Sequence, residues 1–217
     1  MAEFETLDAA GFDDALRRSK ASPLFRAQYA RFKIDKPYGA AETAYAFHSG
    51  PLKVEGDFRA PGFITLIAGD LTVGGLVDLT NPEQGRYDEG GAFIVLGNLF
   101  CGCFSGHYGK CSFVDGTLEA KELLVNAYED SSLVVTGDLR TRFFYGDDIW
   151  AEVGGAARMD YGVGYCLPID YVQAALQSVR PLHDEAMSRR MIGQLDTDYP
   201  QKTLVDLYKA KRRIVVE

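Results

Sequence analysis

The middle of the chain alternates apolar and polar residues around a glycine with fixed apolar neighbours. Between about Leu52 and Tyr165, the blocks of this form have as their central residues Gly56, Gly69, Gly97, Gly116, Gly137 and Gly154. An apolar residue stands two positions before each glycine, with Glu152 as the exception, and another stands two positions after it. Alternation with a period of two predicts strands with one buried face, and the small or turn-forming residue after each glycine predicts a bend.

The spacing of these glycines indicates how the strands are arranged. Successive glycines lie 13, 28, 19, 21 and 17 residues apart. The last three intervals suit one coil of a β-solenoid, in which each coil stacks on the one below. The longest interval contains a polar loop at residues 81–91, and the shortest makes the first block an edge. A sandwich of short hairpins is the alternative, but it does not by itself predict the same offsets in every strand pair.

The sequence therefore predicts a mainly β fold with helical ends. The expected core is a single-stranded β-helix of about five to six coils over residues 52–166. Residues 1–51 are expected to form an N-terminal helical cap and a loop, and residues 167–217 to form C-terminal helices. A chain of 217 residues with this organisation is expected to be one domain.

The predicted helices at the N-terminus follow from helical spacing and a capping signal. Leu7, Phe12 and Leu16 share a helix face, and Ser22-Pro23 has the form of an N-cap followed by the first residue of a second helix. Residues 34–51 are predicted to be loop. This helical segment can close the open end of the solenoid, where strand edges and core would otherwise be exposed.

Three further helices are predicted after Pro168. Residues 169–179 place their apolar side chains on one helix face, a second candidate covers residues 182–195, and a third lies around residues 204–208. We expect these helices to pack on the flank of the solenoid or at its far end. The basic residues of the last one, Lys209, Lys211, Arg212 and Arg213, are predicted to form a solvated face near the negative end of the helix dipole.

Composition and charge narrow the classes of protein. Hydrophobic residues make up 47% of the chain, which excludes a disordered tail protein. No run of about 18 apolar residues and no signal-peptide pattern occurs, so we expect a cytoplasmic protein that does not bind membranes. The formal net charge of −8 disfavours nucleic acid and suits a basic protein as the partner. We expect a monomer or a small homo-oligomer.

One group of soft ligands makes a zinc site worth considering. Cys101, Cys103, His107 and Cys111 follow the pattern Cys-x-Cys-x3-His-x3-Cys, which contains enough ligands for one zinc ion. Free cysteine also behaves as a small hydrophobe, and clustering without a signal peptide favours reduced thiols. We therefore predict that these cysteines fill the narrow core, with the metal site as the weaker alternative and no cofactor.

The sequence carries no clear catalytic signature. His48, His107 and His183 cannot be spaced one coil apart, as the histidines of zinc-dependent solenoid enzymes are. Arg140 and Arg142 with Asp147 and Asp148 could mimic the groove of a solenoid polysaccharide lyase, but solvated charges on the outer face of a coil explain them more simply. We therefore predict a protein that is not an enzyme.

Tyrosines and carboxylates recur in the turns between blocks. If the coils stack in register, these corners can form an acidic, tyrosine-bearing ridge with the composition of an interface for a basic protein. The alternative, in which the tyrosines merely cover coil corners, stays open. The candidate binding residues, called the acidic ridge below, are Tyr87, Asp88, Glu89, Tyr108, Tyr128, Glu129, Asp130, Tyr145, Asp147 and Asp148.

The blocks LVVTGDLRT and TLIAGDLTV, with helical segments at both ends, resemble the β-solenoid proteins encoded beside polymorphic or contact-dependent toxins in bacteria. The resemblance covers about half of the chain and implies an immunity protein that binds and neutralises a cognate toxin, expected to be a basic domain. The repeats more distantly resemble bactofilins, which polymerise end to end. Bactofilins have short disordered termini and open coil ends, so the predicted helices here argue against that assembly.

Overall fold

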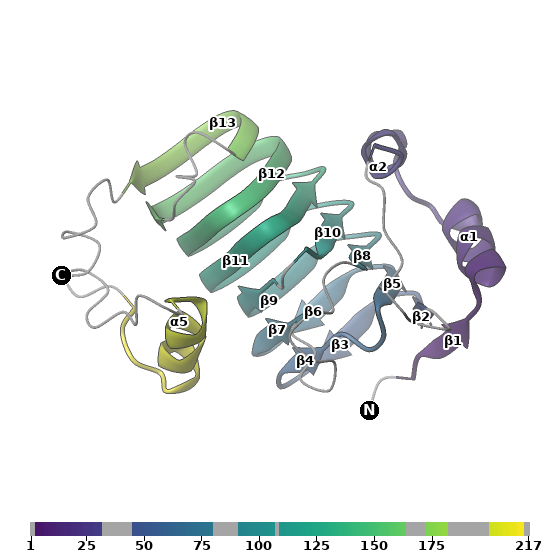
Figure 1. Cartoon of the computed structure of the whole chain (residues 1–217), viewed down its shortest axis with the longest axis horizontal. Helices are drawn as coiled ribbons and strands as arrows, with labels where there is room; N and C mark the ends of the chain where they lie inside the picture. The colour runs from purple at the N-terminus through teal and green to yellow at the C-terminus, as the bar shows by residue number, and fades with distance from the viewer. Residues whose placement is uncertain are drawn as a thin grey trace.

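A computed structural model shows the chain wound into a β-solenoid of about five turns, with helical segments near both ends (Figure 1). This confirms the predicted fold class. The structure describes residues 3–31, 45–79, 91–106, 109–163, 172–181 and 200–214. Within these ranges, the side chains of residues 127–130, 147–148, 163, 172–181 and 200 are not described.

The strands stack into three faces that share one core. The first face contains β2 (Tyr45–Ser49), β5 (Ile64–Ala68), β8 (Ala92–Val95), β10 (Cys111–Val114), later parts of β11 (Leu118–Val135) and β12 (Leu139–Val163), and β13 (Val172–Pro181). The second face contains β3 (Leu52–Val54), β6 (Leu71–Val73), the start of β9 (Leu99–Ser105) and the starts of β11 and β12. The third face contains β4 (Phe58–Arg59), β7 (Leu76–Asp78) and further parts of β9, β11 and β12.

In-register pairing aligns equivalent apolar residues into columns. On the second face, the column consists of Leu52, Leu71, Leu99, Leu118 and Leu139. All five leucines are buried in one continuous cluster that also contains Phe104 and Phe144 from the third face. Burying a leucine side chain stabilises a fold by roughly 1.5–3 kcal/mol. Each added coil therefore contributes a similar amount of stability through its leucine in this column.

Glycines line the corner between the first and second faces because the coils approach each other there too closely for a side chain. A Cβ atom on Gly69 would lie 2.5 Å from the carbonyl carbon of Gly50, and one on Gly97 would lie 2.7 Å from that of Gly69. Gly116 and Gly137 continue this column, and the Gly155 amide donates to the Gly137 carbonyl at 2.9 Å.

The predicted register of the glycine blocks is wrong at both ends. Gly56 lies at the corner between the second and third faces, where its carbonyl accepts from the amide of Gly75 at 3.1 Å. Gly50, rather than Gly56, begins the first glycine column, and Gly155, rather than Gly154, continues it at the far end. The sequence misleads at the first end because Gly56-Asp57 repeats the Gly-Asp pair of the other corner, and at the far end because two glycines, Gly154 and Gly155, are adjacent.

The residue after each glycine caps the next coil, which explains why it is so often Asp or Asn. Asp70 Oδ1 accepts a hydrogen bond from the Asn98 amide at 2.7 Å, and Asn98 Oδ1 accepts one from the Thr117 amide at 2.9 Å. Asp138 Oδ1 repeats the contact with the Ala156 amide at 3.0 Å. These side chains satisfy backbone donors that a corner would otherwise leave unpaired.

The N-terminal helices lie along the first face and not over the open end of the solenoid (Figure 1). In α1 (Ala9–Arg18), Phe12 packs against Tyr45, and in α2 (Pro23–Tyr29), Phe25 packs against Phe113. Ser22 caps α2 as predicted, because its hydroxyl accepts from the Phe25 amide at 3.0 Å. The expectation that the segment closes the coil end is therefore corrected for its helices, which cover a flank.

The first coil is protected at its edge by a short strand. β1 (Glu5–Leu7) pairs with β2 in the antiparallel sense, whereas the other pairings among the described strands are parallel. The Phe4 ring next to β1 lies 5.5 Å from His48 and 6.1 Å from Phe58, measured between ring centroids. β2 also corrects the prediction that residues 34–51 are all loop, because residues 45–49 form the first strand of the solenoid.

The C-terminal predictions hold for one helix and fail for another. Residues 172–181 form β13, which pairs in parallel with β12 and adds a further coil. The helix predicted over residues 169–179 is therefore wrong, because pairing with an exposed strand edge outweighs a weak helical periodicity. The candidate at residues 182–195 lies outside the described residues. The third candidate is confirmed as α5 (Pro200–Lys209), which packs Leu204 against the third face.

Candidate functional site

The described backbone of the acidic ridge at residues 128–130 and 147–148 lies at the corner that joins the third face to the first. Register pairs Ala127 with Asp147 and Ser131 with Ile149, so residues 128–130 and residue 148 occupy this corner in neighbouring coils. The backbone of the two best-described ridge segments is therefore stacked. The side chains of Tyr128, Glu129, Asp130, Asp147 and Asp148 are not described, and Tyr87, Asp88, Glu89 and Tyr108 lie outside the described residues.

Tyr145 is the ridge candidate with a described side chain, and it is buried. Its exposure is 7%, and it belongs to the cluster that also holds Val125, Phe143 and Leu204 of α5. Pairing with Val125 places Tyr145 within the third face, one step before the corner. Its ring therefore contributes to the packing of α5 and not to an exposed surface.

The three described cysteines of the candidate zinc site lie in different packing clusters. Cys101 lies in the central core, Cys103 packs with Leu123 of the third face, and Cys111 lies on the first face under the N-terminal helices. Cys101 and Cys103 separate because the chain turns a corner at Gly102 between them. Burial raises the pKa of both of these thiols, which disfavours the thiolate that a metal or a nucleophilic reaction needs.

The prediction that these cysteines fill the narrow core holds for Cys101, whereas Cys103 and Cys111 are buried outside that core, under α5 and under the N-terminal helices. His107 lies outside the described residues. Among the residues that are described, no group of three or more His, Cys, Asp or Glu side chains is placed to hold a metal ion.

Both arginines proposed as a lyase-like alternative take part in ion pairs, Arg142 with Glu122 of the neighbouring coil and Arg140 with Asp138 of its own coil. Arg140 lies 2.8 Å and Arg158 lies 3.0 Å from Asp138 Oδ2. The Ala156 amide and these two guanidinium groups lower the pKa of Asp138 to about 2. Asp138 is joined to the next coil through the Ala156 amide and Arg158, while Arg140 pairs with it from the same coil.

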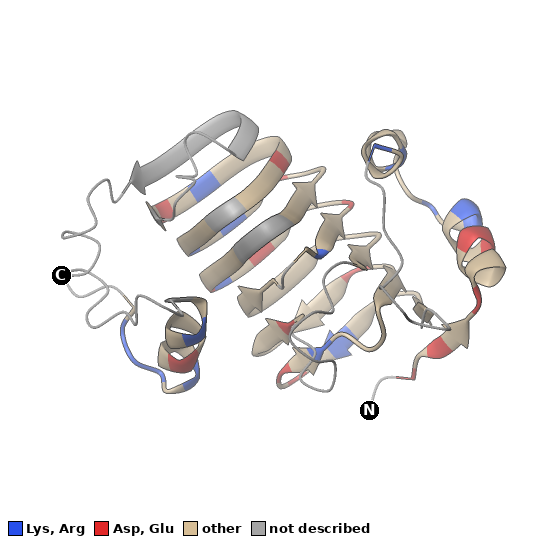
Figure 2. Cartoon of the chain, in the orientation of Figure 1, with Lys and Arg blue, Asp and Glu red and all other residues tan. Residues whose placement is uncertain are grey.

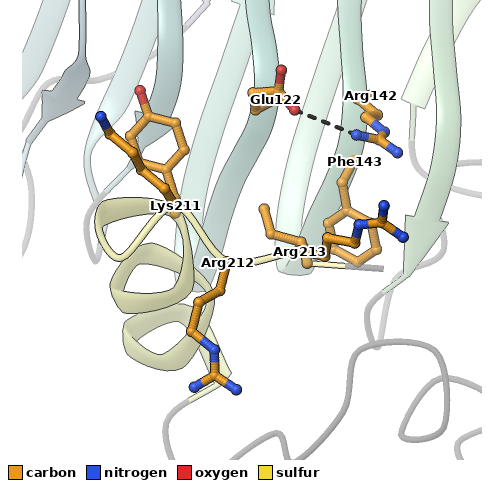
Figure 3. A pocket seen from close by; sticks show the side chains of 8 residues that line it. Glu122, Arg142, Phe143, Lys211, Arg212 and Arg213 are labelled. Carbon is orange, nitrogen blue, oxygen red and sulfur yellow. Dashed lines mark ion pairs between the residues drawn. The ribbon is translucent and has the colours of Figure 1, made fainter. Parts of the chain in front are cut away.

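A hollow on the third face is the concave site that sequence reasoning missed. It lies between β11, β12 and the segment that follows α5, and has a volume of about 310 Å³ (Figure 3). Its lining residues are Glu122, Arg142, Phe143, Tyr208, Lys211, Arg212, Arg213 and Ile214. Phe143 and Ile214 are buried and form an apolar wall, while the four basic residues are exposed.

The basic run lies beyond the last helix and not on it. Lys211 has a left-handed backbone with φ of 53°, and the Arg212 amide donates to the Leu207 carbonyl at 3.0 Å, as in a helix-terminating motif. Of the basic residues predicted to share a solvated helix face, Lys209 is thus in α5, while Lys211, Arg212 and Arg213 follow it. The sequence signal for this arrangement is the apolar Ile214, which directly follows three consecutive basic residues.

Helix α5 is fixed to the solenoid by polar contacts at the edge of this hollow. Gln201 Nε2 donates to the Gly106 carbonyl at 2.7 Å and to Ser105 Oγ at 3.1 Å. Tyr208 places its hydroxyl over Gly102, where an added Cβ would lie 2.2 Å from the hydroxyl oxygen. Burial raises the pKa of Tyr208 to about 12, so it remains a neutral phenol.

Comparison of the chain with known protein families, with curated proteins and with solved structures finds no match. Across the residues that the structure describes, no helix combines the length and the apolar character needed to cross a membrane.

Proposed function

We propose that this chain is a non-enzymatic binding protein whose acidic ridge engages a basic protein partner. The observation that carries the proposal is the register of β11 and β12, which pairs Ala127 with Asp147 and Ser131 with Ile149 on either side of an irregularity. Residues 127–131 and 147–149 include Glu129, Asp130, Asp147 and Asp148, and the formal net charge of the chain is −8. A basic surface is the partner that complements such a corner.

Acidic residues at the same corner of consecutive coils also give a physical reason to expect a partner. Neighbouring strands lie about 4.8 Å apart, and like charges opposed across strands destabilise a sheet. A sequence selected for stability alone would avoid acidic residues at the same corner of consecutive coils. A bound cationic surface neutralises these charges, and relief of the repulsion contributes favourably to the free energy of binding.

The resemblance of the repeats to toxin-associated solenoid proteins makes the partner more specific. We propose a bacterial toxin domain as the basic protein, with the solenoid acting as its cytoplasmic immunity protein. Neutralisation then requires only tight binding that covers the toxin, which agrees with the absence of a catalytic signature in the sequence.

The test begins with affinity capture from cells that encode the protein, using the wild type and Asp147→Lys/Asp148→Lys. A stoichiometric basic partner should be retained by the wild type and lost from the variant. The matched control, Glu55→Lys/Asp160→Lys, changes net charge equally at exposed positions away from the ridge. Equal retention by both variants would contradict the ridge as the binding surface.

Self-assembly through coil ends is the alternative, because β3 and β4 each pair on one side only among the described strands. β1 opposes it, since an antiparallel strand covers the edge of β2 where another solenoid would have to add in parallel. We therefore favour binding of a different protein.

A further inference from the structure

We propose that the hollow between α5 and the third face binds a small ligand that carries a diphosphate group. The hollow faces solvent through its basic residues and is backed by the buried side chains of Phe143 and Ile214 (Figure 3). Its volume of about 310 Å³ is at the lower end of the range of small-molecule pockets, roughly 300–1,000 Å³. This proposal is independent of the acidic ridge, which lies at a coil corner.

The charge of the hollow is opposite to that of the whole protein. Four cationic side chains line it, namely Arg142, Lys211, Arg212 and Arg213, and Glu122 is the carboxylate that accompanies them. Figure 2 shows the basic segment after α5 set against a molecule with many acidic positions. Like charges gathered in one place cost free energy unless an anion neutralises them, so this concentration of cations points to an anionic ligand.

The cations are incompletely neutralised within the chain. The Arg142 guanidinium lies 3.6 Å from the Glu122 carboxylate, which is longer than a hydrogen bond. None of the ion pairs between described residues involves Lys211, Arg212 or Arg213. Within the described part of the chain, no carboxylate competes with an incoming oxyanion for these three side chains.

The basic segment is held in place at both ends, which prepares it for binding. The left-handed Lys211 and the bond from the Arg212 amide to Leu207 fix the direction in which the chain leaves α5. On the other side, Ile214 is buried against the third face. In Figure 3, the Arg213 side chain extends toward the strand that carries Arg142 and Phe143, whereas Arg212 extends away from it. Fixing the backbone reduces the entropy that ordering these side chains would cost on binding.

Phosphate is the anion that this set of donors suits. Guanidinium groups bind phosphate oxygens through paired, charge-assisted hydrogen bonds, and lysine adds a further positive charge. Arg142 and Arg213 come from opposite sides of the hollow, one from β12 and one from the segment after α5. A diphosphate offers one phosphate group to each side, so we expect it to bind best.

Isothermal titration calorimetry of the full chain with pyrophosphate at low ionic strength tests the proposal. We expect saturable binding, with affinity reduced about tenfold or more in Arg142→Ala/Arg213→Ala. The control variant, Arg17→Ala/Arg18→Ala, removes the same charge from exposed positions on α1 and should bind like the wild type. Glu122→Gln should strengthen binding, because it removes the carboxylate that competes for Arg142 and repels the ligand.

Parallel titrations with ADP and with inorganic phosphate separate the possible sources of the diphosphate. Tighter binding of ADP than of pyrophosphate would assign the site to a nucleotide, and the reverse order would assign it to free diphosphate. Either result supports the site if the arginine variant weakens it. The proposal is overturned if neither pyrophosphate nor ADP binds the wild type. It is also overturned if Arg142→Ala/Arg213→Ala binds pyrophosphate as tightly as the control Arg17→Ala/Arg18→Ala does.

Discussion

At the residue scale, the spacing between coils is set by glycines and by the carboxylate or amide that follows them. A Cβ added to Gly97 would contact the Gly69 backbone and the Asp70 side chain. Asp70 in turn accepts a hydrogen bond from the Asn98 amide. The two coils therefore approach closely and are hydrogen-bonded to each other at the same corner. This pairing explains why the glycine and the following residue recur together.

Replacing a glycine in this column should destabilise the fold. A Cβ on Gly97 would lie 2.5 Å from Asp70 Oδ1 and 2.7 Å from backbone atoms of the coil below, so Gly97→Ala should cost about 1–3 kcal/mol. Gly56→Ala is the matched control, because nothing lies within 4 Å of its added Cβ. Urea denaturation measures both changes, and equal stability of the two variants would contradict the assigned corner.

Lys110 provides a prediction about pH. Its side chain is buried with 7% exposure, its ammonium contacts the Phe63 carbonyl at 3.4 Å, and burial lowers its pKa to about 8. Below that pH the folded protein must bury a charge, so Lys110→Met should stabilise the fold at neutral pH by up to about 3 kcal/mol.

The advantage of Lys110→Met should shrink as pH rises from about 8 toward the ordinary lysine pKa of 10.5. In that window the folded protein loses the Lys110 proton while the unfolded chain keeps it, so the stability of the wild type rises. Unfolding free energies measured across this range check the trend, with the exposed Lys121→Met as control. A constant difference at all pH values would show that Lys110 is not buried as a charge.

At the element scale, elements with local signals are predictable from the sequence and those fixed by distant contacts are not. Ser22-Pro23 marks the start of α2, and the leucine spacing marks the coils, because both depend on neighbouring residues. Strand β13 is missed because its pairing with β12 overrides a helix-like spacing of apolar residues. The hollow is missed because it depends on the left-handed Lys211 and on the burial of Ile214 far from its partners in the sequence.

Strand β1 carries a prediction about assembly. Deleting residues 2–7 removes β1 but keeps Asp8, which caps α1 through the Gly11 amide at 2.7 Å. The exposed edge of β2 should then pair with other chains, giving concentration-dependent particles in light scattering. Phe4→Ala, which keeps the strand, should remain dispersed. A deletion variant that stays folded by circular dichroism and does not associate would show that β1 does not protect this edge.

At the scale of the whole molecule, the solenoid separates its surfaces by face. The N-terminal helices cover the first face, and α5 covers part of the third, with the basic hollow at its end. The second face carries an outward row that includes Thr72 and the partly exposed Phe100 in register. The described backbone of the acidic ridge lies at a corner, where residues 127–131 and 147–149 of two consecutive coils are neighbours.

On the proposed function, removing charge from the acidic ridge should change stability and binding in opposite directions. Asp147→Asn/Asp148→Asn keeps the size of both side chains and removes their charge. If repulsion between coils is present, this variant should be more stable than the wild type, by roughly 0.2–1 kcal/mol for each opposed pair. The gain should diminish as salt is added, because salt screens exposed charges.

The most direct test of the proposed function is titration calorimetry of the purified basic partner against the wild type and Asp147→Asn/Asp148→Asn. The affinity of the variant should fall about tenfold or more, and the difference should narrow as salt is added. A fall in affinity combined with unchanged or increased stability would locate binding at the acidic ridge. Equal affinity of the two proteins at low salt would contradict the proposal.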